Sequence, residues 1–311
     1  MSQGIVTVVG SYVTDLMSRT PHMPKVGETV LGGPFKMGPG GKGGNQAVAA
    51  ARQGSTVYMV TKVGDDEFGT YALANFTKET INTQFVFVDP VEATGAALIA
   101  VDDNGDNLIV VALGACGTLS TEEVTQASQV IATSAIVLVQ LETSNKAVVE
   151  TIAIAKGHGV PVILNPAPYH EFPREILQDI TYITPNETEA YSLTGLKVDT
   201  EVDALQAAKA IYVMGVPNVI ITLGKKGCYY YNGGVSGKLY SGFEVQALDT
   251  TGAGDAFNGG LAYALASGQA LSDAIIHANA VAALSVTKVG TSPAMPTHEE
   301  VVTFKAINTI I

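Results

Sequence analysis

Short apolar runs rich in β-branched residues alternate with stretches of helical spacing along most of the chain. The runs predict strands at residues 5–9, 57–60, 135–139, 160–164, 182–184 and 219–222. The intervening stretches predict helices at residues 45–52, 122–131, 146–156 and 201–214. Two further predicted helices, residues 256–266 and 272–286, are almost wholly small and apolar, so we expect both to be buried against a sheet. Such alternation is typical of an α/β protein whose mainly parallel sheet has helices on both faces.

Two segments break this alternation. Residues 12–41 carry prolines, glycines and short apolar pieces without an amphipathic helix. Residues 95–114 predict a hairpin, with strands at 96–101 and 108–111 joined by a turn rich in Asp and Asn. Together the two segments predict a small antiparallel sheet projecting from the main body. Because the chain contains no linker, low-complexity tract or repeat, we expect residues 1–311 to form one domain.

Composition narrows the choice of partners. Of 311 residues, 47% are hydrophobic and only 15% are charged, which indicates a well-packed fold. The 17 basic and 29 acidic side chains give a net charge of −12, which argues against nucleic acid or an anionic membrane as the main partner. A small anionic ligand remains compatible, because backbone N–H groups bind phosphate without lysine.

Cysteines, histidines and apolar runs predict the location of the protein and the state of its cysteines. The two cysteines are far apart in sequence and the five histidines form no metal-binding pattern, so neither a disulfide nor a metal site of this kind is expected. The longest apolar run, residues 135–141, is too short to cross a bilayer. The beginning of the sequence lacks the features of a signal peptide. We therefore expect a cytoplasmic protein.

The strongest chemical signal is the segment Asp249-Thr250-Thr251-Gly252-Ala253-Gly254-Asp255, which immediately precedes an apolar helix. Glycines at a helix start allow several N–H groups to converge, and the helix dipole adds positive potential there. The segment therefore predicts an anion hole, with Asp255 beside the bound anion. In the alternative interpretation, Thr250, Thr251 and Asp255 only cap the helix and match its dipole.

Polar residues at the ends of other predicted strands add further candidates. The segment 38–46 is dense in glycine and ends with Asn45, a pattern suited to backbone contact with a polyhydroxy ligand. Asp15 and Glu142 follow predicted strands, where parallel sheets bind ligands. The segment 222–227 could line a nucleotide site or form a surface turn.

The pair Asn186 and Glu189 has the spacing of a helix capping box, which is the favoured interpretation of that segment taken alone. Neither a dinucleotide fingerprint nor a P-loop is complete at any of the glycine-rich segments.

Taken together and in this order, the motifs resemble the ribokinase and deoxyribokinase group of the PfkB-type carbohydrate kinases. The resemblance extends over nearly the whole chain and is most specific at residues 249–255. Gln46 after Asn45 resembles the pentose kinases in particular. The segments that carry the resemblance are residues 40–47, 165–168, 184–190, 222–224 and 249–255.

The resemblance implies a doubly wound α/β domain with a β-sheet lid, formed by about residues 12–41 and 95–114, that also serves as the interface of a homodimer. It implies transfer of the γ-phosphoryl group of ATP to the primary 5-hydroxyl of ribose or 2-deoxyribose, with Mg²⁺. Asp255 would be the catalytic base, and Gly252, Ala253 and Gly254 would form the anion hole. The residues implied to bind sugar are Val13, Asp15, Gly41, Lys42, Asn45, Glu142 and Asp255. The residues implied to bind ATP are Asn186, Thr222, Gly224, Gly227, Gly254 and Asn279.

The resemblance also implies metal sites. Glu189 would organise Mg²⁺ through water. An activating K⁺ would be held beside the anion hole by Asp249, Thr251, Ser285, Lys288 and Gly290. A serine that is frequent among relatives a little further on is Ala294 here.

A second departure concerns Val13, two residues before Asp15, where ribokinases typically have an asparagine that binds sugar hydroxyls. Deoxyribose-directed relatives resemble this chain in having an apolar residue there. The sequence thus favours 2-deoxyribose as a substrate at least as good as ribose. The alternatives are a fructose or nucleoside kinase on the same scaffold and a non-catalytic sugar-binding regulator.

Overall fold

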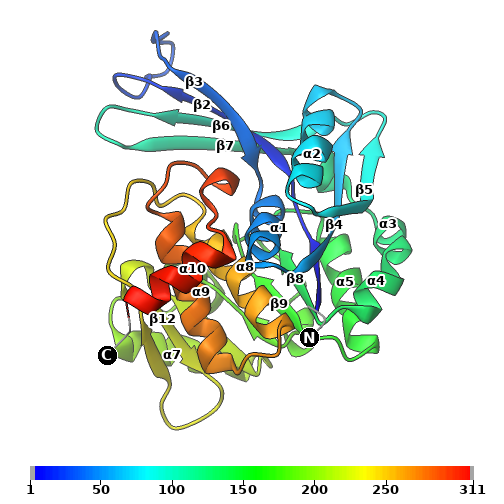
Figure 1. Ribbon diagram of the computed structural model, residues 1–311, viewed down its shortest axis with the longest axis vertical. Coiled ribbons are helices and arrows are strands. Elements are labelled where there is room, and N and C mark those ends of the chain that lie inside the picture. Colours follow the sequence, from blue (N-terminus) through cyan, green and yellow to red (C-terminus); the bar gives the residue numbers. More distant parts are fainter. Residues whose placement is uncertain (1–3, 309–311) are drawn as a thin grey trace.

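The computed structural model describes residues 4–308, which form two sheets covered by helices. In the large sheet of this described part, nine strands lie in the order β13-β12-β11-β10-β9-β8-β1-β4-β5 (Figure 1). Neighbouring strands from β5 to β11 are parallel, whereas β12 and β13 pair antiparallel at one edge. The strands are β1 (Ile5–Val9), β4 (Thr56–Gly64), β5 (Asn82–Asp89), β8 (Ile136–Gln140), β9 (Val162–Asn165), β10 (Tyr182–Ile183), β11 (Asn218–Thr222), β12 (Gly227–Tyr231) and β13 (Lys238–Ser241).

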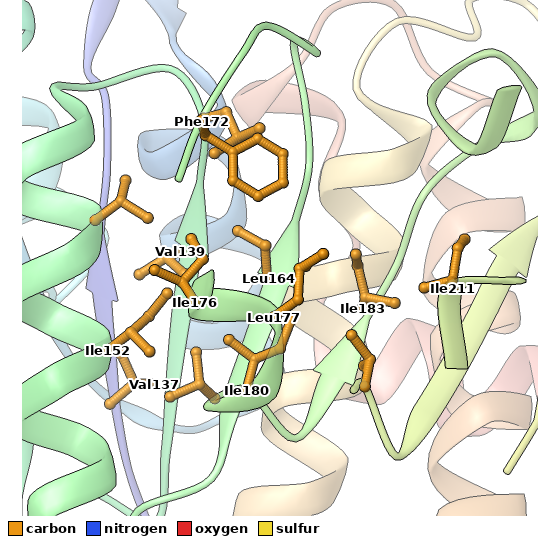
Figure 2. Packing of buried hydrophobic residues seen from close by; sticks show 14 of the residues in the cluster. Val137, Val139, Ile152, Leu164, Phe172, Ile176, Leu177, Ile180, Ile183 and Ile211 are labelled. Carbon is orange, nitrogen blue, oxygen red and sulfur yellow. The ribbon is translucent and has the colours of Figure 1, made fainter. Parts of the chain in front are cut away.

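Two hydrophobic cores, one on each face of the large sheet, follow from the alternation of side chains along its strands. On β8, Ile136 and Leu138 join the core of the helices α1 (Lys42–Gln53), α2 (Glu67–Lys78), α8 (Ala253–Ala266), α9 (Leu271–Ser285) and α10 (His298–Ile307). Val137 and Val139 join the opposite core, beneath α3 (Thr121–Gln126), α4 (Ser128–Thr133), α5 (Asn145–Gly157), α6 (Glu187–Thr194) and α7 (Glu201–Val213). Figure 2 shows Val137 and Val139 beside Ile152 of α5 in this second core.

A smaller sheet extends from one end of the body, at the top of Figure 1. Its strands are β2 (Val13–Arg19), β3 (Phe35–Gly40), β6 (Thr94–Val101) and β7 (Asn107–Gly114), in the order β3-β2-β6-β7. The predicted hairpin is confirmed, because β6 and β7 pair antiparallel, as do β2 and β3. The central pair, β2 and β6, is parallel. The predicted fold class, an α/β fold with a mainly parallel sheet and a small antiparallel second sheet, is confirmed, except that the pair β2 and β6 within the small sheet is parallel.

Local differences from the predicted elements have physical reasons. Helix α1 begins at Lys42 rather than at residue 45, so Gly43 and Gly44 form its first turn. A Cβ on Gly43 would lie 2.7 Å from the backbone of Ser11, so the glycine allows close packing that the sequence pattern did not reveal. The predicted helix 122–131 is divided at Ala127, and both halves pack on α5. No helix within residues 4–308 is long and apolar enough to cross a membrane.

Candidate active site

Asp255 lies in the first turn of α8 and is buried. Its exposed fraction is 6%. Gly252 is the N-cap, with a left-handed φ of 78°, and no side chain caps the helix. The threonines of this loop therefore do not cap α8, and that part of the simpler interpretation is wrong. Asp255 lies in the first turn, where its charge matches the helix dipole. The first N–H groups of a helix have no acceptor within it, and a Cβ on Gly254 would meet nothing within 4 Å. The loop thus leaves room for an anion at the helix start.

Both oxygens of Asp255 accept hydrogen bonds from α1. Asn45 Nδ2 donates to Oδ2 over 3.0 Å, and Gln46 Nε2 donates to Oδ1 over 2.9 Å. These contacts require α1 and α8 to pack closely. Gly259 makes this possible, because a Cβ there would lie 2.4 Å from the Cβ of Ala49. The sequence-distant segments 42–46 and 252–255 therefore form one structural unit.

Burial and neighbouring charges have opposing effects on the pKa values of Asp255 and Lys42 in this unit. Burial raises the pKa of Asp255, and the positive charge of Lys42 and the amide donors act in the opposite direction without cancelling it. Burial acts to lower the pKa of Lys42, but the carboxylates of Asp255, Glu142 and Glu189 outweigh it and raise that pKa. Lys42 therefore stays protonated at neutral pH. A fixed positive charge faces the site at which we expect an anion.

Two adjoining cavities meet at the loop. The smaller, about 160 Å³, is polar and includes Lys42, Glu189 and Asp255 in its lining. The larger, about 1030 Å³, is of the size that accommodates a cofactor-sized ligand. The cavities share Asn186, Thr222, Thr250, Ala253 and Gly254. The residues expected to bind nucleotide all line the larger one: Asn186, Thr222, Gly224, Gly227, Gly254 and Asn279.

Asn186 and Glu189 form the reciprocal capping box of α6. Asn186 Oδ1 accepts from the Glu189 N–H over 2.8 Å, and the Glu189 carboxylate accepts from the Asn186 N–H over 2.9 Å. Burial raises the pKa of Glu189. The capping interpretation is confirmed, and the same carboxylate also lines the polar cavity. Capping and cavity lining are compatible in this structure.

The residues expected to bind sugar come from both parts of the fold: Val13 and Asp15 belong to strand β2 of the small sheet, whereas Lys42 and Asn45 belong to α1. Glu142 accepts hydrogen bonds from the Lys42 N–H over 2.8 Å and from the Ser11 hydroxyl. Asp15 accepts a hydrogen bond from Thr291 Oγ1 over 3.2 Å. None of Val13, Asp15, Gly41 and Glu142 lines either cavity described above. Gly41 has a φ of 81°, a conformation that favours glycine.

The segments expected to hold K⁺ are adjacent. Asp249 Oδ1 accepts from the Thr251 N–H over 3.0 Å, and Asp249 Oδ2 accepts from the Gly290 N–H over 2.9 Å. These bonds lower the pKa of Asp249 against the effect of burial. Lys288 directs its side chain to Glu300 of α10, and its backbone N–H donates to the carbonyl of Ser285. Within residues 4–308, no group of three or more His, Cys, Asp or Glu side chains could hold a metal ion.

Sequence reasoning did not assign a site role to several residues that contact the candidates. Ser292 Oγ donates to Asn45 Oδ1 over 2.7 Å, next to the bond from Thr291 to Asp15. Gln140 was visible only as a lone amide in an apolar strand. The sequence identified Gln46 only as a residue that resembles the pentose kinases, without a role in the site. Their contacts are made between segments about a hundred or more residues apart, which no local pattern could reveal.

Asp15 allows a test of this electrostatic environment. Burial raises its pKa to about 6, against the bond from Thr291 and with the help of Glu142 and Asp255. A carboxyl group whose pKa is higher in the folded than in the unfolded state destabilises the fold, and this effect is complete at pH values above the folded-state pKa. It disappears at pH values below the unfolded-state pKa of about 3.9. We expect Asp15→Asn to raise the melting temperature at pH 7.5, with a gain that shrinks towards pH 4, while weakening sugar binding. Asp103→Asn, in an exposed turn, is the control. An equal gain at both pH values would contradict the prediction.

This geometry suits transfer of a phosphoryl group from a ligand in the larger cavity to a hydroxyl held at Asp255, which is the chemistry of small-molecule kinases. A comparison with known protein families identifies which class of kinase this is. A model described as pfkB family carbohydrate kinase matches residues 5–298, and the chain belongs to this family. It is thus an enzyme that transfers a phosphoryl group to a sugar hydroxyl.

Individual relatives match over nearly full length. The chain is 43% identical to a ribokinase of Haemophilus influenzae, over 96% of this chain and 97% of that protein. It is 38% identical to a deoxyribokinase of Salmonella typhi, over 97% and 99% of the two chains. The crystal structure of a Thermotoga maritima ribokinase has a TM-score of 0.89 at 35% identity, covering 97% of this chain and 99% of that one. An Arabidopsis thaliana ribokinase complexed with ribose and ATP has a TM-score of 0.89 at 30% identity, covering 98% and 99%.

Proposed function

We propose that this enzyme is an ATP-dependent pentose kinase that phosphorylates the primary 5-hydroxyl of 2-deoxyribose or ribose. The observation that carries the proposal is the buried carboxylate of Asp255 at a helix N-terminus, beside a polar cavity that adjoins a nucleotide-sized one. The named relatives, a ribokinase and a deoxyribokinase, support a pentose substrate. A cytoplasmic location, where ATP is available, fits this activity.

In this proposal Asp255 takes the proton of the sugar hydroxyl while the N–H groups of residues 252–254 stabilise charge on the migrating phosphoryl group. Burial raises the pKa of Asp255, but a carboxylate is still a weak base for an alcohol. Phosphoryl transfer tolerates this because its transition state is loose. The alcohol becomes acidic only as its oxygen bonds to phosphorus, so the base acts late. Positioning and electrostatic stabilisation then supply most of the rate enhancement.

Ligand contacts follow from the placement of the side chains. We assign the sugar to Asp15, Gly41, Asn45 and Glu142, with Lys42 facing the transferred phosphoryl group. We assign ATP to the larger cavity, whose six expected contact residues surround it.

Mg²⁺ and K⁺ complete the proposal. Glu189 lines the polar cavity and offers the hard oxygen donors that Mg²⁺ prefers, so it suits an ion bound through water. Mg²⁺ neutralises phosphate charge when it is bound. Backbone N–H groups of Thr251 and Gly290 bond to Asp249 and hold these segments together. The oxygens of Asp249 and Thr251 and the carbonyls near Ser285, Lys288 and Gly290 are donors of the kind that suits K⁺.

The activity is tested by a coupled assay of ADP release with ribose, 2-deoxyribose, fructose and nucleosides, each with and without K⁺. A pentose should give the highest kcat/KM. A higher kcat/KM for fructose or a nucleoside would show that the substrate is not a free pentose. Absence of turnover with every sugar would favour a non-catalytic regulator.

The identity of the pentose depends on Val13. Its side chain is 2% exposed, shares a strand face with Asp15, and packs with Ala97 and Cys116. An apolar side chain cannot satisfy a buried sugar hydroxyl, yet apolar pockets reject an added hydroxyl only weakly, by roughly 10²-fold. We expect kcat/KM for 2-deoxyribose to equal or exceed that for ribose, and Val13→Asn to shift the ratio towards ribose. A much higher kcat/KM for ribose in the unaltered enzyme would contradict this.

The small sheet supports a proposed homodimer in which it also covers the sugar. Leu98 and Val110 are a cross-strand pair, exposed by 56% and 55%. The register places Met37 in the same row, on the same face as Phe35 and Leu108. A continuous exposed apolar face of this kind marks an interaction surface, and a second copy of the chain presents a matching one.

We expect Leu98→Asp to convert the dimer into monomers in analytical ultracentrifugation, because it buries a charge at that interface. Val213→Asp, at an exposed apolar position of α7, is the control and should leave the mass of the dimer unchanged. A monomeric unaltered enzyme at every concentration would contradict the proposed dimer.

A further inference from the structure

A chain of buried amides leads from the large sheet to Asp255. Gln46 and Gln140 are both 0% exposed. Gln46 Nε2 donates to Asp255 Oδ1 over 2.9 Å and to Asn165 Oδ1 over 3.1 Å. Gln46 Oε1 in turn accepts from Gln140 Nε2 over 2.7 Å. Asn165 Nδ2 donates to the Thr184 carbonyl over 3.1 Å, which turns its oxygen towards Gln46.

Each contact fixes the direction of the Gln46 amide. An ionised carboxylate accepts hydrogen bonds and donates none, so the amide nitrogen must face Asp255. Its oxygen then faces Gln140, whose amide nitrogen donates to it. Reversal of this amide would set its oxygen against a carboxylate oxygen, and Gln140 and Asn165 both oppose that reversal.

Gln140 occupies a position at which stability alone favours an apolar residue. It ends the otherwise apolar strand β8, and its Oε1 is a buried oxygen with no hydrogen-bond partner in the described part of the chain. A buried polar atom without a partner is destabilising. Such a local violation of packing rules is expected where a residue serves function.

We propose that Gln46 is a positioning residue, which holds Asp255 Oδ1 so that Oδ2 faces the acceptor hydroxyl, and that Gln140 sets the direction of the Gln46 amide. The inference rests on the proposed function. A carboxylate has about four lone-pair sites, and two are engaged here by Gln46 and Asn45. Oδ2 therefore keeps a free site for the hydroxyl proton. Gln46 touches neither cavity, so its effect is exerted through Asp255.

The test compares two buried glutamines of α1. Gln46→Met keeps the length of the side chain but removes the donor to Asp255. Gln53→Met is the matched control, because Gln53 is 1% exposed, belongs to the same helix, and bonds its amide to His277 and the Pro296 carbonyl instead. Gln140→Met perturbs only the far end of the chain of amides and serves as a second test if Gln46→Met fails to fold.

We expect Gln46→Met to lower kcat about 10- to 100-fold, with the KM for ATP unchanged, because a displaced catalytic group is costly. A hydrogen bond to the ionised form lowers a carboxyl pKa, so its loss should move the acid limb of kcat/KM up by about one pH unit. The charged groups around Asp255, which are Lys42, Glu142, Asp15 and Glu189, are the same in all variants. Gln140→Met should move both quantities in the same direction by less.

Two outcomes would overturn the inference: an acid limb and kcat in Gln46→Met that match the unaltered enzyme, or equal losses in Gln46→Met and Gln53→Met. Melting temperatures of the variants separate loss of fold from loss of rate. Absence of pentose phosphorylation in the unaltered enzyme would instead refute the proposed function, so the two failures are distinguishable.

Discussion

Replacement of Asp255 by asparagine is expected to lower kcat about 10³-fold while ATP still binds, because a positioned general base contributes 10²- to 10⁴-fold to such reactions. The amide cannot accept the hydroxyl proton. It also presents a nitrogen to either Asn45 or Gln46, both of which donate to the native carboxylate. The cavity that we assign to ATP is lined by other residues, so its affinity should change little. Steady-state kinetics and nucleotide titration measure the two quantities separately.

The matched control is Asp273→Asn. Asp273 is an exposed carboxylate in the first turn of α9, so it interacts with a helix dipole as Asp255 does. If Asp255 only matched the dipole of α8, the two variants would lose stability alike and both would retain turnover. A kcat close to that of the unaltered enzyme in Asp255→Asn would remove this carboxylate from the mechanism.

Much of the fold could be predicted because its strands are apolar on both faces. The run at residues 136–139 has no polar side chain, which is typical of a buried parallel strand between two layers of helices. The antiparallel strands β12 and β13 were not predicted, since their tyrosine-rich and short sequences lack a clear period. The division at Ala127 and the early start of α1 depend on tertiary packing, which overrides local preference.

The candidate site was predictable where its chemistry is local. The loop 249–255 encodes its own turn and helix start, and the capping box of Asn186 and Glu189 depends on spacing alone. Gln140 and Ser292 could not be predicted, because their importance comes from contacts across the fold. A lone polar residue in an apolar strand is the one signal that would have drawn attention to Gln140.

Replacement of Lys42 by methionine should have the second large effect. Its ammonium group lies among the carboxylates of Asp255, Glu142 and Glu189, and it lines the polar cavity. Without it, that region carries only negative charge, which repels the phosphoryl group in both the ground state and the transition state. We expect kcat to fall about 10²- to 10³-fold, as for loss of one preorganised electrostatic partner, and the KM for ATP to rise.

The same substitution has a second consequence that a merely structural role would not produce. Lys42 lowers the pKa of Asp255 against the effect of burial, so its loss should raise that pKa and move the acid limb of kcat/KM to higher pH. Lys36→Met makes the same change of charge on the exposed part of β3 and should leave the limb in place. Lys42→Arg keeps the charge, so its acid limb should stay near that of the unaltered enzyme even where the bulkier guanidinium lowers kcat. An unmoved acid limb in Lys42→Met would show that this ammonium group does not act on the base.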